Sequence, residues 1–407
     1  MPVSFIPMAD VSEGGQWLGG QVRPLREVSS GFTAFADEDV LVAKITPCFE
    51  NGKGAHVVGL INGVGFGSTE FHVLRARHGT SPRFVHHLVQ GVRLRWTAEA
   101  FMSGSAGQRR VPPSFFEEYP APDLDYEEQV AVSRVLDTLD TTIRQTEAII
   151  EKLKQVKQGL LHDLLTRGIA DNGELRPPQS EAPHLYKESA LGWIPKAWDA
   201  MPMRAACSTI TKGTTPAVDQ MWQGDEGIRF LRVDNLSFDG RFDFAASNFR
   251  ISPDTHTHSL GRSRCYPGDV LTNIVGPPLG KLGLITSATG EVNINQAIAL
   301  FRPSGVLLPA FVLLWLGSAL AQTWLRQRAK QTSGQVNLTL ALCQELPVLR
   351  MGLEEQQRVI DRTQAMQNRL TSEDDKLTKL LALKTGLMDD LLTGRVRVTS
   401  LLLGAPA

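Results

Sequence analysis

The stretches Glu127-Glu128-Gln129 and Asp163-Leu164-Leu165-Thr166 bound a segment that occurs a second time, from Glu354-Glu355-Gln356 to Asp390-Leu391-Leu392-Thr393. A shift of 227 positions aligns residues 107–166 with 334–393 without a gap, and 17 of the 60 aligned positions are identical. A repeat this long predicts two copies of one structural unit, related by an approximate twofold axis.

Each copy carries mainly apolar residues at steps that alternate between three and four, over residues 132–164 and 359–391. This is the spacing of the inner positions of a coiled coil, so each copy predicts a long amphipathic helix. Polar residues interrupt both series at two pairs of equivalent positions, 227 residues apart. These residues are Thr146, Lys157, Glu373 and Lys384. Because the interruptions match, we expect the helices to pack on each other. Lys157 and Lys384 could set the register or extend outward to solvent.

The globular parts repeat more faintly. Asp39-Val40-Leu41 resembles Asp269-Val270-Leu271, and Gly52-Lys53 resembles Gly280-Lys281 at nearly the same offset. Short β-rich runs broken by Gly and Pro indicate strands and loops in both parts, followed by helices. We therefore predict an α+β fold, in which two pseudo-symmetric α/β domains are joined by two long antiparallel coiled-coil helices.

Proline before each long helix and glycine after it set the predicted boundaries. The expected segments are a first domain at 1–126, a long helix at 127–168, a linker at 169–185, a second domain at 186–353, a long helix at 354–394 and a tail at 395–407. The second domain opens with about 40 residues that have no counterpart in the first. They include Trp193 and Trp198, which should anchor strands in a core. We therefore expect the first domain to lack its opening segment.

Charge is distributed unevenly, although the formal net charge is only −1. Residues 71–116 hold seven arginines and one acid, and residues 301–343 hold four basic residues and no acid. A basic, acid-poor stretch is often just a solvated face, but here it recurs at matching places in both copies. A twofold molecule with two such stretches fits a partner that can be read twice at fixed spacing, and duplex DNA is such a partner.

The four cysteines are scattered without a C-x-x-C pair, which argues against a zinc site or a disulfide framework and for a reducing cytoplasm. The N-terminus shows no secretory signal. Catalytic motifs are also missing. Gly276-Pro277-Pro278-Leu279-Gly280-Lys281 fails as a phosphate loop, because its spacing is one short and no Ser or Thr follows. His256-Thr257-His258 and His86-His87 lack further metal ligands nearby in the sequence. We therefore predict a recognition subunit without a cofactor or metal of its own.

These features resemble a known family. Asp39-Val40-Leu41-Val42-Ala43-Lys44-Ile45-Thr46-Pro47, Gly65-Phe66-Gly67-Ser68-Thr69-Glu70-Phe71 and Gly104-Ser105-Ala106-Gly107-Gln108-Arg109-Arg110-Val111 resemble the first target-recognition domain of type I restriction-modification specificity subunits. Leu191-Gly192-Trp193-Ile194-Pro195 and Gln335-Val336-Asn337-Leu338 resemble the second such domain. The proline and Glu-Gln starts of the long helices look like the conserved regions of that family, and the resemblance covers nearly the whole chain.

The resemblance implies a non-catalytic subunit that reads a bipartite site in double-stranded DNA, one half with each domain, while the helix pair fixes the gap between the halves. It also implies two methyltransferase subunits, which bring S-adenosylmethionine and flip the target adenine out of the duplex, and restriction subunits that cleave. ATP and Mg²⁺ would likewise belong to the partners. A membrane partner is not expected.

Candidate DNA contacts are assigned by chemistry. The candidates for phosphate contact are Arg109, Arg110, Arg326, Arg328 and Lys330. Lys53 and Lys281 on glycine-flanked turns could enter a groove or neutralise a phosphate. The polar side chains able to read base edges are Ser68, Thr69, Asn273, Asn295, Gln296, Gln335 and Asn337. For each, an ordinary surface or capping role is the alternative. For the whole chain, the alternative is a coiled-coil scaffold that binds only protein. The DNA sequence recognised and the spacer length do not follow from the sequence.

Overall fold

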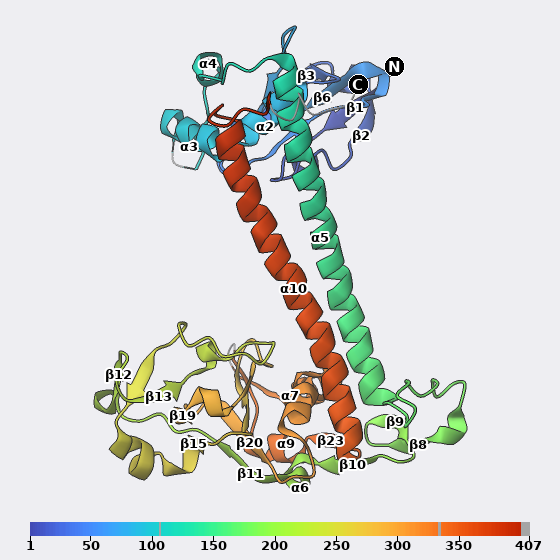
Figure 1. Cartoon of the computed structure of the whole chain (residues 1–407), viewed down its shortest axis with the longest axis vertical. Coiled ribbons are helices and arrows are strands. Elements are labelled where there is room, and N and C mark those ends of the chain that lie inside the picture. Colours follow the sequence, from blue (N-terminus) through green and yellow to red (C-terminus); the bar gives the residue numbers. More distant parts are fainter. Residues whose placement is uncertain (106, 333–334, 400–407) are drawn as a thin grey trace. The chain divides into compact units, whose positions relative to one another are not determined.

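The computed structural model describes residues 1–105, 107–332 and 335–399. The chain divides into two compact units that share the two long helices (Figure 1). Unit 1 comprises Met1–Ile150 and Ser372–Ala407, and unit 2 comprises Glu151–Thr371. The division therefore falls inside the long helices, whereas the predicted domain boundaries fall at the helix ends.

Helix α5 (Tyr126–Thr166, 41 residues) and helix α10 (Leu353–Leu391, 39 residues) are the long helices of Figure 1. Their bounds lie within three residues of the helices predicted at 127–168 and 354–394. Both begin with two glutamates in the first turn, where negative charge interacts favourably with the helix dipole.

The two core lysines of the heptad series make matching contacts between the helices. In unit 1, Lys384 Nζ lies 2.5 Å from Asp140 Oδ1. In unit 2, Lys157 Nζ donates to Gln367 Oε1 at 2.6 Å. Positions 140 and 367 are equivalent in the repeat, as are 157 and 384, because each pair is 227 apart. The lysines therefore bind across the antiparallel helices in each unit and do not simply extend to solvent. Apolar packing accompanies the contact in unit 1 through Val132, Leu136, Met388 and Leu391.

Unit 1 carries two sheets, with strand orders β2-β1-β6-β3 and β5-β4-β7. Strands β1 and β6 are parallel, and all four residues of β4 are buried between its neighbours. The strand bounds are β1 Pro2–Ile6, β2 Gln21–Pro24, β3 Thr33–Ala36, β4 Val40–Ala43, β5 Gly54–His56, β6 Val64–Gly67 and β7 Phe71–Leu74. The shorter helices are α1 Leu25–Val28, α2 Pro82–Gln90, α3 Val92–Phe101 and α4 Pro113–Glu118.

Unit 2 repeats this plan with additions. Its larger sheets have the orders β12-β14-β13-β19-β15 and β11-β20-β16-β18. Parallel β13 and β19 correspond to β1 and β6, and β16 lies between β18 and β20 as β4 lies between β5 and β7. The strand bounds are β11 Cys207–Lys212, β12 Met221–Gln223, β13 Ile228–Leu231, β14 Phe249–Ile251, β15 Arg264–Cys265, β16 Val270–Asn273, β18 Leu282–Leu284, β19 Val292–Ile294 and β20 Ile298–Pro303. The faint repeat seen in the sequence is therefore a repeat of sheet topology.

Three smaller sheets complete unit 2, with the orders β8-β9, β10-β23 and β17-β22-β21. Their strand bounds are β8 Tyr186–Ser189, β9 Gly192–Pro195, β10 Asp199–Pro202, β17 Val275–Gly276, β21 Lys330–Thr332, β22 Gln335–Asn337 and β23 Pro347–Arg350. The shorter helices are α6 Met203–Ala206, α7 Pro309–Gly317, α8 Ala319–Arg328 and α9 Leu340–Glu345.

The prediction that two tryptophans of the opening segment anchor a core is correct for one of them. Trp198 is 1% exposed, and its Nε1 donates to Glu355 Oε2 at 2.9 Å. Trp193 is 49% exposed on strand β9, so it does not anchor a core. The alternation of a strand places neighbouring side chains on opposite faces, and Ile194 takes the buried place instead.

A glutamine in the first turn of each long helix ties that helix to a shorter one. Gln129 donates to Leu124 O at 2.9 Å and accepts from Ser81 N at 2.9 Å, at the start of α2. Gln356 donates to Met351 O at 2.9 Å and accepts from Leu308 N at 2.8 Å, at the start of α7. The partners are also 227 positions apart, so the repeat preserves the hydrogen bonds as well as the residue. Each glutamine satisfies backbone groups that a helix start leaves without partners.

We predict that Gln356→Leu destabilises unit 2 by on the order of 3 kcal/mol, because it leaves Leu308 N, Met351 O and Val306 O without this partner. Urea unfolding followed by tryptophan fluorescence measures the change. The control is Gln357→Leu, at the exposed neighbouring position, which should change stability little. Equal stability losses for the two variants would contradict the assignment.

Candidate nucleic-acid interface

Three exposed basic residues of unit 2, all of them predicted phosphate contacts, lie at the end of α8 and in the strand that follows it. Arg326, Arg328 and Lys330 are all exposed, and Arg326 and Lys330 make no ion pair with a residue in the described ranges. The guanidinium carbon of Arg328 lies 4.4 Å from the centre of the Trp324 ring, which holds the cation in place. All three cationic side chains are thus open to solvent, and their contact with phosphate stays a prediction.

Strand β22 pairs with β21 and carries two further predicted residues. Asn337 lies opposite Lys330 in the register of this hairpin and has partners of its own. Gln335 also belongs to β22, but its side chain lies outside what the structure describes. The hairpin therefore brings Asn337 beside one of the predicted phosphate contacts.

A polar cavity of about 280 Å³ in unit 2 gathers two predicted base-reading residues. Asn295 and Gln296 line it together with Thr215 and Arg232, while Phe230 and Met221 supply apolar surface. The guanidinium of Arg232 lies 5.0 Å from the centre of the Phe249 ring. The set of guanidinium, amides and hydroxyl matches the groups that read base edges. Sequence reasoning missed Arg232 and Thr215.

Asn273 does not fit its predicted role in base reading. It is 1% exposed, and its amide donates to Val275 O and Pro278 O at 3.1 and 2.9 Å. Its Oδ1 accepts from Gly280 N and Lys281 N at 3.0 and 2.9 Å. The side chain thus organises the turn from 274 to 281 and has no group left for a base.

Lys53 and Lys281 also face inward, in contrast to the prediction of exposed turn lysines. Lys53 Nζ lies 3.4 Å from Met8 O, and Lys281 Nζ lies 3.4 Å from Val233 O. Both side chains are half-buried. The acceptors are equivalent in the repeat, which indicates one structural role for the two lysines. In the sequence, a lysine next to glycine suggests a turn with an exposed side chain. In the structure, each lysine side chain instead reaches a backbone carbonyl group of its own unit.

In unit 1, acidic residues from outside the basic stretch pair with four of its seven arginines. Arg110 donates to both carboxylate oxygens of Glu70 at 3.0 and 2.8 Å, and this lowers the pKa of Glu70. Arg109 lies 3.6 Å from Glu50. Arg75 is likewise paired with Asp39 and Arg83 with Asp137. The surface formed by residues 71–116 therefore carries less positive charge than the sequence count suggests, because carboxylates from other parts of the chain pair with some of its arginines. The predicted contacts Ser68 and Thr69 lie just before Glu70, with Thr69 exposed.

His87, Asp137 and Asp140 form the one group in the described chain that has the spacing of metal ligands, within 4.8 Å of one another. Two cations occupy this cluster: Arg83 pairs with Asp137, and Lys384 pairs with Asp140. Burial alone would raise the pKa of Asp137, but hydrogen bonds from His87 and Arg83 outweigh it and hold the pKa well below its usual range. The cluster is therefore an ion-pair network in which both carboxylates already have cationic partners.

Sequence relatives carry the predicted family name. The specificity subunits of the type I restriction enzymes EcoEI and EcoAI of Escherichia coli are 37% and 35% identical to this chain over 175 and 180 residues. Each match covers 40% of this chain but only 28% of the relative. The MjaVIII specificity subunit of Methanocaldococcus jannaschii is 21% identical over 72% of this chain and 66% of its own length. No model of a protein family matches the sequence.

Solved structures agree at the level of the fold. A type I R-M system structure, described by its complex assembly and conformational transition, matches with a TM-score of 0.57 and 16% identity over 97% of this chain and 92% of that one. The HsdS subunit from Thermoanaerobacter tengcongensis matches with a TM-score of 0.51 and 17% identity over 97% and 91%. The chain is thus similar to type I specificity subunits, in sequence over 40% of its length and in fold over 97% of it. The predicted resemblance is thereby confirmed, and the relatives are named for specificity rather than for catalysis.

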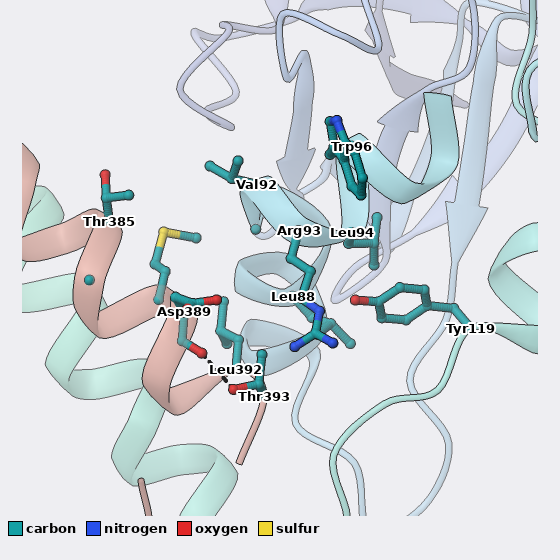
Figure 2. A pocket seen from close by; sticks show the side chains of 13 residues that line it. Leu88, Val92, Arg93, Leu94, Trp96, Tyr119, Thr385, Asp389, Leu392 and Thr393 are labelled. Carbon is teal, nitrogen blue, oxygen red and sulfur yellow. Dashed lines mark hydrogen bonds between the residues drawn. The ribbon is translucent and has the colours of Figure 1, made fainter. Parts of the chain in front are cut away.

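Besides the cavity of unit 2, the structure has an apolar hollow in unit 1. None of the predicted site residues lines it. A cavity of about 450 Å³ lies between α2, α3 and the last turns of α10 (Figure 2). Apolar side chains such as Leu88, Val92, Trp96 and Leu392 line it, and Trp96 is 75% exposed. Figure 2 shows Arg93 and the hydroxyl group of Tyr119 at the same hollow. An exposed apolar hollow of this kind marks a candidate surface for a protein partner. No helix in the described part of the chain is long and apolar enough to cross a membrane.

We predict that Asn273→Ala lowers the stability of unit 2 by on the order of 2–4 kcal/mol, because four hydrogen bonds to the buried turn are lost. Gln296→Ala, at the exposed rim of the polar cavity, should leave stability nearly unchanged. Chemical unfolding of both variants measures this. A stable Asn273→Ala protein with altered DNA preference would restore Asn273 to the interface.

Proposed function

We propose that this chain is the DNA-recognition subunit of a type I restriction-modification complex and reads a bipartite site, one half with each unit. The observation that carries the proposal is the exposed, unpaired cationic edge of unit 2, close in sequence to the hairpin that bears Asn337. The names of the sequence relatives and the shared fold support it. A protein-binding coiled-coil scaffold, the alternative, gives no reason for such an edge.

The polar cavity of unit 2 is the proposed place of base reading. Arg232 carries the fork of donors that suits the two acceptors of guanine, and Asn295 and Gln296 can pair with adenine. Met221 supplies apolar surface, against which a base methyl group can pack. In unit 1, Arg109 and Arg110 are held by Glu50 and Glu70, so they would meet DNA as part of ion-paired networks rather than as free cations.

The catalytic parts belong to partners in this proposal. Two methyltransferase subunits would supply S-adenosylmethionine, and restriction subunits would supply ATP-driven cleavage with Mg²⁺. The chain itself contributes DNA specificity. The apolar hollow beside Trp96 is the proposed contact for a methyltransferase subunit, because an exposed tryptophan above an apolar floor is typical of an interaction hot spot.

We predict that replacing both Arg326 and Arg328 with Ala weakens DNA binding by the assembled methyltransferase and flattens its salt dependence. If each arginine contacts one phosphate, the slope of log K against log salt should decrease by roughly 1.8. Fluorescence anisotropy at several salt concentrations measures the slope. The charge-matched control is Arg204→Ala combined with Arg262→Ala, at exposed positions elsewhere in unit 2. An unchanged slope in the first variant, with the fold intact, would remove these arginines from the interface.

We predict that Trp96→Ala weakens association with the methyltransferase subunit by on the order of 2 kcal/mol, about thirtyfold in Kd. The fold should not change, since the side chain is 75% exposed. Sedimentation or calorimetry with the purified partner measures the affinity. Trp193→Ala removes another exposed tryptophan, in unit 2, and should leave the affinity as it is. Wild-type affinity in Trp96→Ala would place the partner elsewhere.

A further inference from the structure

A second cavity of unit 1, of about 290 Å³, is polar where the hollow beside Trp96 is apolar. It lies between the loop of residues 14–17, helix α2 and helix α5. The side chains that matter for its chemistry are Trp17, Arg83, His86, Asp140 and Arg144. None of these residues was among the predicted DNA contacts, and the proposed function does not use the cavity.

Two residues of the cavity lining each contain a buried nitrogen that makes no hydrogen bond within the described chain: Trp17 Nε1 and His86 Nδ1. His86 as a whole is 3% exposed. Tryptophan Nε1 can only donate a hydrogen bond, and a neutral histidine can donate through Nδ1. Buried polar atoms normally have partners, so two unpartnered nitrogens in residues that line one cavity point to a partner that the described chain does not supply.

The charges around the cavity leave one cation without an ion pair. Arg83 is paired with Asp137, Lys384 with Asp140, and His56 with Glu38. Arg144 donates to Thr141 Oγ1 at 3.1 Å and makes no ion pair with a described residue. Burial, together with the positive charge of Arg83 and of the neighbouring histidines, lowers the pKa of His86 far below its usual value. A neutral His86 in electropositive surroundings suits an anionic acceptor.

The equivalent place in unit 2 has the same fold but lacks these polar and charged side chains. At the equivalent positions, Phe242 replaces Trp17 (225 residues on), and Ala310, Leu313 and Thr371 replace Arg83, His86 and Arg144 (227 residues on). The loops correspond in space as well. A side chain at Gly15 would meet His86 at 2.8 Å, and one at Gly240 would meet Leu313 at 3.0 Å. The polar set of unit 1 is therefore not required for the loop to pack on its helix.

In unit 2 the protein joins this loop to the long helices by itself, because Arg241 Nη2 donates to Thr371 Oγ1 at 3.1 Å. In unit 1 the residue equivalent to Arg241 is Gln16, and the cation is on the helix instead, as Arg144. Two groups that could join loop and helix, the Trp17 N–H and the Arg144 guanidinium, are both donors. An acceptor between them would complete the connection that unit 2 makes directly.

We propose that the polar cavity of unit 1 binds a small oxyanion, which accepts hydrogen bonds from Trp17 and His86 and pairs with Arg144. A bound anion would join the loop of residues 14–17 to helix α5 and stiffen unit 1. The chemistry is that of a phosphate or carboxylate group, since charge-assisted bonds from guanidinium and N–H donors suit both. Inorganic phosphate and acetate are the two probes that distinguish these sources.

The test follows the indole N–H of Trp17 in the full chain by ¹⁵N NMR. The chain has seven tryptophans, and the Trp17 resonance is the one lost in Trp17→Phe, a variant that carries the residue of unit 2. Sodium phosphate is titrated against sodium chloride at constant ionic strength, and acetate in a parallel series. We expect one of the two to shift this resonance in a saturable manner at millimolar concentration.

Two variants decide whether the cavity is responsible. Arg144→Thr introduces the residue that unit 2 has at this position. It should lower the affinity for the anion about tenfold or more, the loss expected for one charge-assisted hydrogen bond. Arg134→Thr, at an exposed position on the same helix, should bind as the wild type does. The remaining indole resonances report whether each variant is folded. No saturable shift with either anion, or equal affinities of Arg144→Thr and Arg134→Thr, would overturn the proposal.

Discussion

A buried glutamate at the start of each long helix is the constraint on which each unit depends. Glu128 is fully buried, and both of its oxygens accept from Arg397, at 2.8 and 2.7 Å. Glu355 is 7% exposed and accepts from Arg176, from Trp198 Nε1 and from Ile169 N. In each unit the arginine follows the end of the other long helix. A carboxylate in such a place is stable only with its charge partner, so the start of one helix and the end of the other must stay together. The neighbouring glutamines then tie the shorter helices to this point.

Local periodicity explains why the long helices could be predicted from the sequence, and long-range pairing explains why much of the candidate site could not. Heptad spacing and flanking proline and glycine depend on residues a few positions apart. The role of Asn273 depends on a turn that brings Lys281 back to it, and the charge of Arg110 depends on Glu70, 40 positions earlier. A basic stretch counted along the sequence ignores acids that folding brings in. The exposure of Arg326 and Arg328 at the end of α8 is easier to predict, because their segment of the sequence contains no acidic residue that could pair with them.

Comparison of the two units separates scaffold residues from site residues. Where the repeat keeps a residue, that residue is bonded internally: the Asp39–Arg75 and Asp269–Arg302 pairs, the inward lysines and the first-turn glutamines. Several predicted DNA contacts are changed between the copies. Ser68-Thr69 becomes Asn295-Gln296, and Arg110 becomes Asn337. These retained pairs therefore belong to the shared scaffold, whereas the two units present different polar groups at these changed positions.

This division carries an argument about specificity. Two units with one scaffold and different polar edges would read different sequences, because the donors and acceptors offered to a base differ while the backbone that presents them does not. Unit 2 offers amides, a hydroxyl and the guanidinium of Arg232 around a cavity, whereas unit 1 offers guanidinium groups already held by carboxylates. An ion-paired guanidinium reaches DNA only with its carboxylate beside it, and a carboxylate accepts from cytosine but repels phosphate. In the proposed function, the acids that pair with Arg109 and Arg110 would therefore also contribute to the selection of bases, because a carboxylate offers an acceptor to cytosine.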